Sequence, residues 1–242
     1  MAPPLAFLAI VAIIWQLGAA DAHNILLPTF TATVSAFVDI VVGGAIWEPL
    51  LRSNLTMIIG FVISAVIAVP LGLVMGRHLF IDRAAAPYVS LLVVMPAAPL
   101  LPIIVMMIGF GLSAGVLLVM VFTVVYIVVN TRAGIRSVDP RLVEMAHSYG
   151  ANELNLWRYV LIPGALPAIA TGLRIGLGRA FAGMVLGELL LLSSGIGLLL
   201  LTYRAANASD HVFAVVVVLL VEATLISSGM RRLERRLQPP SV

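Results

Sequence analysis

The chain has 242 residues, of which 62% are apolar and 10% charged, and its mean hydropathy is +1.13. Soluble domains carry about 45–50% apolar and about 25% charged residues, so this composition excludes a soluble enzyme. Cysteine is absent, which excludes disulfides, iron–sulfur clusters, cysteine-ligated zinc and thiol nucleophiles. The 14 cationic residues are all arginine, and the formal net charge is +3. What remains is a polytopic α-helical membrane protein.

Six stretches approach the roughly 20 apolar residues that a helix needs to cross the hydrocarbon core of a bilayer. They are continuous apolar runs, without the alternation over about ten residues that a membrane barrel shows. In chain order, we predict spans at about Leu5–Ala20, Leu55–Gly76, Ala84–Met107, Leu112–Val129, Pro163–Leu192 and His211–Met230. The predicted fold is therefore all-α, with about six transmembrane helices.

The first of these spans has a second interpretation. Ala20-Asp21-Ala22 follows a short apolar core and resembles a signal-peptidase cleavage site. The residues before that core, Met1 to Pro4, carry no positive charge, whereas a signal peptide normally has one there. We expect an uncleaved helix, and cleavage stays the alternative.

Arginines are distributed unevenly between the two sides of the predicted spans. Those after the second, fourth and sixth spans are Arg77, Arg83, Arg132, Arg136, Arg141, Arg158, Arg231, Arg232, Arg235 and Arg236. On the other side lie only Arg52 and Arg204, while Arg174 and Arg179 fall inside the fifth span. Because cytoplasmic loops are enriched in arginine, we predict that both termini are cytoplasmic. The basic tail is expected to rest on anionic lipid rather than on nucleic acid.

The longest predicted cytoplasmic segment, residues 132–163, lies between the fourth and fifth spans. Asp139 before a proline is typical of a helix N-cap, and Gly150 suits the left-handed residue that ends a helix. Leu142, Ala146 and Tyr149 share one face of this first helix, and a second short helix is predicted at about Asn152–Leu161. The segment is therefore predicted to be a helix, a glycine turn and a second helix. An interfacial linker that rests on lipid is the alternative.

This segment resembles the cytoplasmic loop of the inner-membrane permease subunits of binding-protein-dependent ABC importers. The hallmark of that family is Glu-Ala-Ala, three residues, Gly, nine residues, then Ile-x-Leu-Pro. Here Glu144-Met145-Ala146 is followed after three residues by Gly150, and after nine more by Val160-Leu161-Ile162-Pro163. Each departure replaces one apolar residue with another.

The resemblance extends over nearly the whole chain, to the branch that imports nitrate, sulfonates and taurine. It is carried by Leu27-Pro28, Gly60-Phe61, Pro70–Leu73, Arg136–Arg141, Leu161–Pro167, Thr171–Arg174, Glu188 and Ser194–Gly197. The third span contains Pro96, Pro99 and Pro102, as in that branch, although no tryptophan follows. Sulfonate, taurine or nitrate is the solute that the resemblance implies, and a neutral heterocycle such as a vitamin precursor stays open.

The resemblance implies the fold of a type I ABC importer permease, as a single transmembrane domain over residues 1–242. The region common to the family spans about 50–236, and the coupling loop about 132–163. This loop is implied to dock on a separate ATPase, with Ala146 as a small residue of the docking face. The residues implied to couple the two subunits are Glu144, Met145, Ala146, His147, Gly150, Ala151, Asn152 and Pro163.

The implied partners are two ATPase subunits that bind ATP and magnesium, a solute-binding protein, and a second permease copy in a homodimer. The implied location is the bacterial cytoplasmic membrane. An ATP-binding P-loop requires a lysine, which this chain lacks, so we expect neither an ATPase site nor catalytic residues here. The histidines, at positions 23, 78, 147 and 211, lie far apart, so we expect no metal and no other cofactor in this chain.

Charges inside membrane spans are costly and therefore mark functional candidates. Glu188 lies late in the fifth span and Glu222 near the middle of the sixth. One interpretation places both along the translocation path with the three prolines of the third span, and the other pairs Glu222 with Arg179 as a tie between helices. An ion-coupled secondary transporter that uses Glu188 and Glu222 is the alternative function, although no internal repeat supports it.

Overall fold

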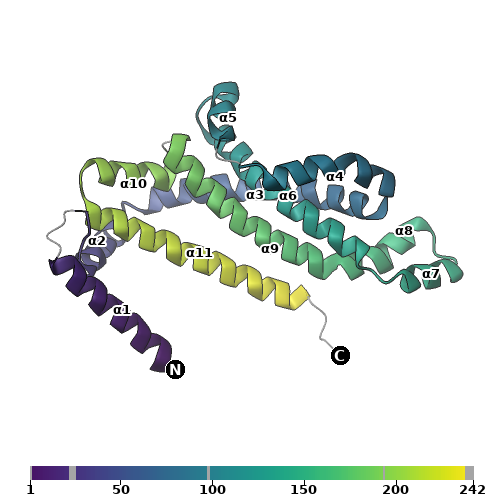
Figure 1. Cartoon of the computed structure of the whole chain (residues 1–242), viewed down its shortest axis with the longest axis horizontal. Helices are drawn as coiled ribbons and strands as arrows, with labels where there is room; N and C mark the ends of the chain where they lie inside the picture. Colours follow the sequence, from purple (N-terminus) through teal and green to yellow (C-terminus); the bar gives the residue numbers. More distant parts are fainter. Residues whose placement is uncertain (1, 22–25, 97–98, 193, 238–242) are drawn as a thin grey trace. The chain divides into compact units, whose positions relative to one another are not determined.

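The computed structural model describes residues 2–21, 26–96, 99–192 and 194–237, which form helices joined by short turns, with no strand among them (Figure 1). In chain order the elements are α1 (Ala2–Asp21), α2 (Phe30–Val42), α3 (Trp47–Arg77), α4 (Leu79–Val94), α5 (Leu100–Ile108), α6 (Leu112–Arg136), α7 (Pro140–Ser148), α8 (Glu153–Leu156), the π-helix η1 (Trp157–Leu161), α9 (Ile162–Gly187), the π-helix η2 (Glu188–Leu192), α10 (Gly195–Ala205) and α11 (Ser209–Leu237). The predicted all-α class is confirmed. Ala22 of the cleavage motif and His23 lie outside the described residues.

Within the described part of the chain, four helical segments are long and apolar enough to cross a membrane. They are Trp47–Arg77, Leu112–Arg136, Glu153–Leu190 and Ser209–Arg232. These segments contain or overlap the predicted second, fourth, fifth and sixth spans. Shorter apolar helices cover Ile10–Ala20, Phe30–Val42 and Gly195–Ala205, and the last two were not predicted.

The predicted third span, Ala84–Met107, is wrong as a single helix, because its prolines break it into α4 and α5. α4 ends at Val94, two residues before Pro96, and a proline disfavours helical backbone in the residue that precedes it. α5 begins directly after Pro99, with Pro102 in its first turn, where a missing N–H costs no hydrogen bond within the helix.

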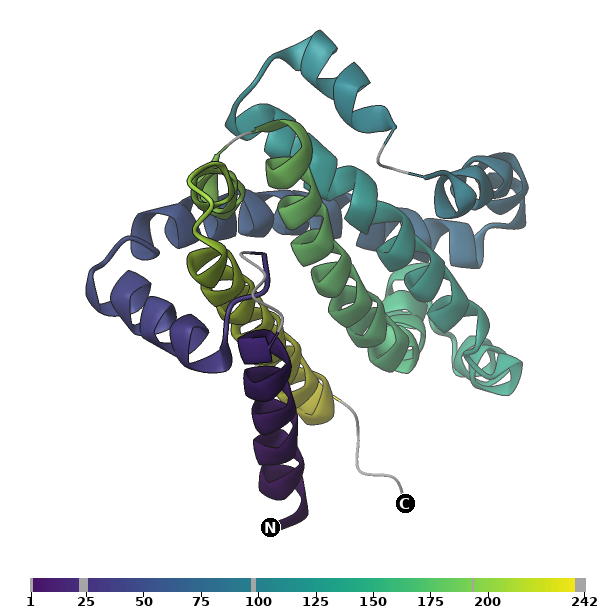
Figure 2. The same cartoon turned by 60° about the vertical axis from the view of Figure 1, so that its left-hand side comes forward.

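The chain divides into two units, which are described separately. In unit 2 (residues 56–186 and 225–242), α6 packs against both α3 and α9 (Figure 2). A Cβ atom on Gly60, Gly72 or Gly76 of α3 would lie only 2.6–2.7 Å from a side chain of α6. A Cβ atom on Gly172 or Gly176 of α9 would lie 2.7–2.8 Å from a side chain of α6. Small residues at such contacts let the backbones of membrane helices pack tightly.

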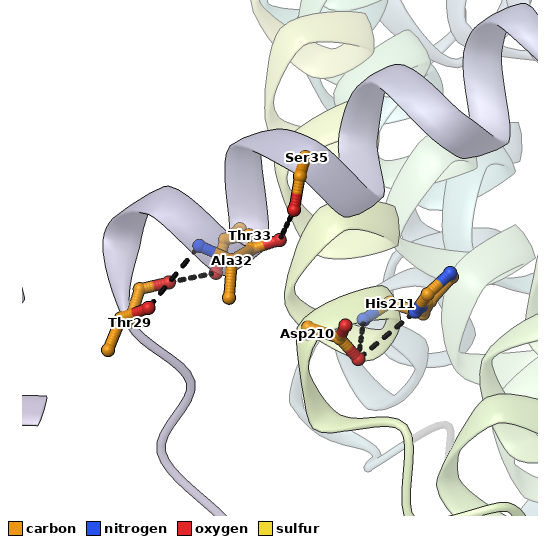
Figure 3. A network of polar contacts seen from close by, with 6 residues as sticks. All are labelled: Thr29, Ala32, Thr33, Ser35, Asp210 and His211. Atoms are coloured by element: carbon orange, nitrogen blue, oxygen red, sulfur yellow. Dashed lines mark hydrogen bonds and ion pairs between the residues drawn. The ribbon is translucent and has the colours of Figure 1, made fainter. Parts of the chain in front are cut away.

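Unit 1 comprises residues 1–55 and 187–224. The ring of Trp15 in α1 lies 5.7 Å from that of Phe30 in α2 and 5.8 Å from that of Phe213 in α11, between ring centroids. At the start of α2, the Oγ1 of Thr29 accepts a hydrogen bond from the backbone N–H of Ala32 at 3.3 Å (Figure 3). These contacts hold α1, α2 and the start of α11 together within unit 1.

Candidate functional site

The predicted cytoplasmic segment forms two short helices joined by a glycine turn, as its sequence indicates. At the start of α7, the Oδ1 of Asp139 accepts a hydrogen bond from the N–H of Arg141 at 2.8 Å. Gly150 follows with a φ of +74°, a conformation that side chains disfavour. At the start of α8, the Oδ1 of Asn152 accepts from the N–H of Asn155 at 2.9 Å. Both helices thus begin at the capping residues that the sequence offers.

The second helix does not stop before Pro163 but continues into α9. The π-helix η1 lies directly before this proline, and the N–H of Ile162 donates to the carbonyl of Trp157, five residues earlier. A proline ring in a regular α-helix clashes with the carbonyl four residues before it, and a π turn relieves that clash by displacing the carbonyl. α8 is therefore the end of a long continuous helix rather than a separate piece, which the sequence did not predict.

α7 and α8 pack on the ends of the membrane helices through a small apolar core. The buried residues of this core are Ile135, Ala146, Leu156, Leu161, Ala165 and Ile169. Ala146, expected on the docking face, is only 9% exposed and packs in this core. Its small side chain points inward, and the close approach that it permits is to the chain's own helices.

Beside the buried side of α7, which carries Ala146, an adjoining strip of the helix is apolar and exposed. Leu142, Met145 and Tyr149 are spaced by three and four residues and therefore share one face of the helix, and their exposed fractions are 45%, 50% and 86%. Glu144 and His147 are exposed as well. A contiguous apolar face on a short amphipathic helix suits insertion into a groove of another protein. The sequence pattern found Leu142 and Tyr149 but missed Met145 as a member of this face.

Ion pairs connect this segment and the helices around it. Arg77 at the end of α3 pairs with Glu153 of α8, with 3.2 Å between Nη2 and Oε1. Asp82 of α4 is buried and pairs with both Arg132 and Arg136 of α6. A pocket of about 280 Å³ lies next to these contacts, and it is lined by Gly76, Arg77, Ile135, Val138, Pro140, Val143, Glu144 and Leu161. The sequence did not predict these pairs, because their members lie on different helices.

The residues expected along a translocation path fall in both units. Pro96, Pro99 and Pro102 flank the break between α4 and α5 in unit 2, whereas Glu188 and Glu222 belong to unit 1.

Glu188 is buried and holds the start of α10. Its Oε2 accepts hydrogen bonds from the Oγ of Ser53 at 2.8 Å and from the N–H of Gly197 at 3.0 Å. The Oγ of Ser53 in turn accepts from the N–H of Ile196 at 2.9 Å. A helix start leaves backbone N–H groups without partners and carries partial positive charge, and a carboxylate satisfies both. Glu188 therefore has a structural task in unit 1.

Glu222 and Arg179, which one interpretation of the sequence pairs, belong to unit 1 and unit 2, and each has a contact within its own unit. Glu222 accepts a hydrogen bond from the Nδ2 of Asn54, the residue after Ser53 in α3. The guanidinium of Arg179 lies over the ring of Tyr126, 4.4 Å from its centroid. The other arginine of this span, Arg174, pairs with Glu234, with 2.7 Å between Nε and Oε2.

Residues 68–239 match the family described as the binding-protein-dependent transport system inner membrane component. The chain is 30% identical to the taurine transport system permease protein TauC of Escherichia coli K12, over 80% of this chain and 70% of that protein. It is 32% identical to the aliphatic sulfonates transport permease protein SsuC of the same organism, over 92% of this chain and 85% of that protein. Its fold is similar to an inward-facing structure of the MetNI methionine ABC transporter, with a TM-score of 0.64 and 21% identity over 80% of this chain and 94% of that chain.

Proposed function

Because the chain belongs to the family of binding-protein-dependent transport system inner membrane components, we propose that it carries a small sulfonate across the membrane and that a separate ATPase drives this transport through the loop Glu144–Pro163. As a member of this family it is a permease subunit of an ABC importer, a multi-pass protein of the inner membrane. The observation that carries the proposal is the helix–glycine–helix segment, whose second helix continues into a membrane span.

In the proposed coupling, α7 docks in a groove of the ATPase through Leu142, Met145 and Tyr149. Glu144 pairs there with a cation of the ATPase, although an exposed ion pair contributes only about 0–1 kcal/mol, so the apolar contact dominates. Gly150, with its positive φ, sets the angle between α7 and α8. Because α8 is continuous with α9, a displacement of the docked segment moves the span itself, and two discrete packings of the spans give alternating access.

The proposed importer contains two ATPase subunits that bind ATP and magnesium, two copies of this chain, and a binding protein that delivers the solute. The absence of lysine supports an external motor, since a P-loop needs that residue. Both chain termini lie in the cytoplasm in this proposal, because the arginine-rich loops are on that side.

Sulfonate is the proposed solute class because the relatives TauC and SsuC are named for taurine and aliphatic sulfonates. Pro96, Pro99 and Pro102 form part of the path wall in this proposal, since backbone that departs from a regular helix inside a membrane requires protein or a water-filled cavity beside it. Glu188 and Glu222 hold α10 and α11 to α3 through Ser53 and Asn54. This structural use of both carboxylates favours the ATP-driven importer over the ion-coupled alternative.

The test is co-purification of the tagged permease with the ATPase and binding protein encoded beside it. Met145→Glu places a charge on the exposed face of α7, and Met145→Leu is the matched control because it keeps volume and polarity. We expect the amount of ATPase that co-purifies with the glutamate variant to be lower than with the leucine variant by a factor of about ten or more. A desolvated charge makes the free energy of docking less favourable by more than about 1.4 kcal/mol, which corresponds to that factor. Failure of the wild type to retain any ATPase contradicts the proposed function, and equal retention by the two variants contradicts the docking face.

A further inference from the structure

Arg179 carries a charge on the membrane-spanning part of α9, and no carboxylate among the described residues of unit 2 pairs with it. Its recorded contact is the ring of Tyr126 on α6. Arg174, five residues earlier, is neutralised by Glu234, which belongs to the basic C-terminal end of α11. At about 1.5 Å per residue, Arg179 lies about 7 Å deeper along the helix than that ion pair. The two arginines of this span therefore have different electrostatic surroundings.

The guanidinium of Arg179 extends only about one turn back toward the cytoplasmic end of α9 and does not reach that end. Gly172 of α9 faces Asn130 of α6, and Gly176 faces Ile127 and Thr123, so Tyr126 lies at the depth of the turns around Gly176. By stacking there, Arg179 keeps its charge inside the span. A long cationic side chain near a helix end normally extends to the interface instead.

The surroundings of Arg179 on α9 are open in this structure. Arg179 is exposed, and a Cβ atom on the adjacent Gly178 would meet no atom within 4 Å. If lipid covered this face, the arginine would cost about 2.5–3.5 kcal/mol on insertion scales, so such residues normally face a polar space. In a permease, the polar space inside the membrane is the translocation path.

We propose that Arg179 is the residue of the translocation path that binds the sulfonate group of the solute, with Tyr126 as the platform that positions its guanidinium. This inference rests on the proposed function. A guanidinium has five N–H donors in a planar fork that matches an oxyanion, and contact with an aromatic ring uses none of them. A single guanidinium attracts the anion but binds it weakly enough to release it, and a transport path requires both.

The test is uptake by the complete importer, with its ATPase and binding protein, reconstituted in proteoliposomes that contain ATP. The probes are radiolabelled ethanesulfonate and, as a neutral heterocycle, riboflavin. We expect Arg179→Gln to lower ethanesulfonate uptake at least about tenfold, because a charge-assisted hydrogen bond to the anion contributes at least that factor. Arg179→Lys keeps the charge and is expected to fall between the wild type and Arg179→Gln. Wild-type uptake by Arg179→Gln would overturn the inference.

A second pair of variants leaves Arg179 in place, so that the test does not depend on the assembly of Arg179→Gln. Gly178→Glu puts a negative charge in open space one residue from Arg179, where it opposes the attraction of an anion, and Gly178→Gln is its uncharged match. The glutamate variant is expected to take up ethanesulfonate several-fold more slowly than the glutamine variant, and equal rates overturn the inference. If the wild type takes up riboflavin instead of ethanesulfonate, or takes up neither solute, the proposed sulfonate function is wrong. If the wild type takes up ethanesulfonate and all variants match its rate, only the proposed role of Arg179 is wrong.

Discussion

At Gly150, backbone conformation alone decides which side chains are tolerated. A Cβ atom there would meet nothing within 4 Å, but φ is +74°. Asparagine adopts this left-handed conformation readily, whereas a β-branched residue does not, at a cost of about 1–2 kcal/mol. We expect Gly150→Val to retain less ATPase in co-purification than Gly150→Asn, which should behave like the wild type. Equal retention by the two variants would show that the turn does not require its left-handed residue.

The intramembrane charges show what single residues reveal in a sequence and what they do not. Their place in apolar segments follows directly from hydropathy, and Glu188, Glu222, Arg174 and Arg179 all lie in helical segments long and apolar enough to cross a membrane. Their partners do not follow, because the contact of Glu188 with Ser53 joins residues 135 positions apart. Without an aligned set of relatives, no pattern in one sequence links such positions. The electrostatic surroundings of an intramembrane charge depend on the side chain it contacts: Arg174 pairs with a carboxylate, whereas Arg179 stacks on an aromatic ring.

The contact between α3 and α6 has no room for a methyl group at its glycines. A Cβ atom on Gly72 would lie 2.7 Å from the Cβ of Thr131 and 2.9 Å from the carbonyl oxygen of Val128, whereas one on Gly229 of α11 would meet nothing within 4 Å. Alanine is normally the better helix residue by about 0.5–1 kcal/mol, but overpacking costs about 1–3 kcal/mol. We therefore expect Gly72→Ala to lower the melting temperature of the purified protein and Gly229→Ala to leave it equal or higher. A Gly72→Ala protein that melts above the wild type would contradict the packing of α3 on α6.

The elements themselves were predictable where apolar runs are long and capping residues are present. The four longest spans, α7 with Asp139, and the turn at Gly150 follow from such local signals. Short apolar helices such as α2 and α10 carry no span-length signal, so they were missed. The continuity of α8 with α9 depends on a π turn before Pro163, and a proline in sequence normally indicates a boundary. The inward orientation of Ala146 depends on α8 packing beside α7, which helical periodicity alone does not determine.

The membrane topology of the whole molecule can be tested directly by thiol labelling. The chain contains no cysteine, so a single introduced cysteine provides the one thiol that can react. Tyr149 on the coupling segment and Ala206 in the turn between α10 and α11 are both exposed. One spanning segment, Glu153–Leu190, lies between them, and α10, at about 16 Å for its 11 residues, is too short to cross a core of about 30 Å. We therefore expect the two positions to lie on opposite sides of the membrane.

From the arginine distribution we predict that Tyr149 lies in the cytoplasm. In intact spheroplasts of cells that produce this chain without its ATPase, a membrane-impermeant maleimide is expected to label Ala206→Cys and not Tyr149→Cys, and permeabilisation should expose both. Labelling of both cysteines from outside would mean that α10 also crosses the membrane, so that Glu153–Leu190, α10 and α11 would each span it. Labelling of Tyr149→Cys alone would put this segment on the side without ATP. Since a permease without its own ATPase can be driven only where ATP is available, that result would remove the physical basis for coupling through α7.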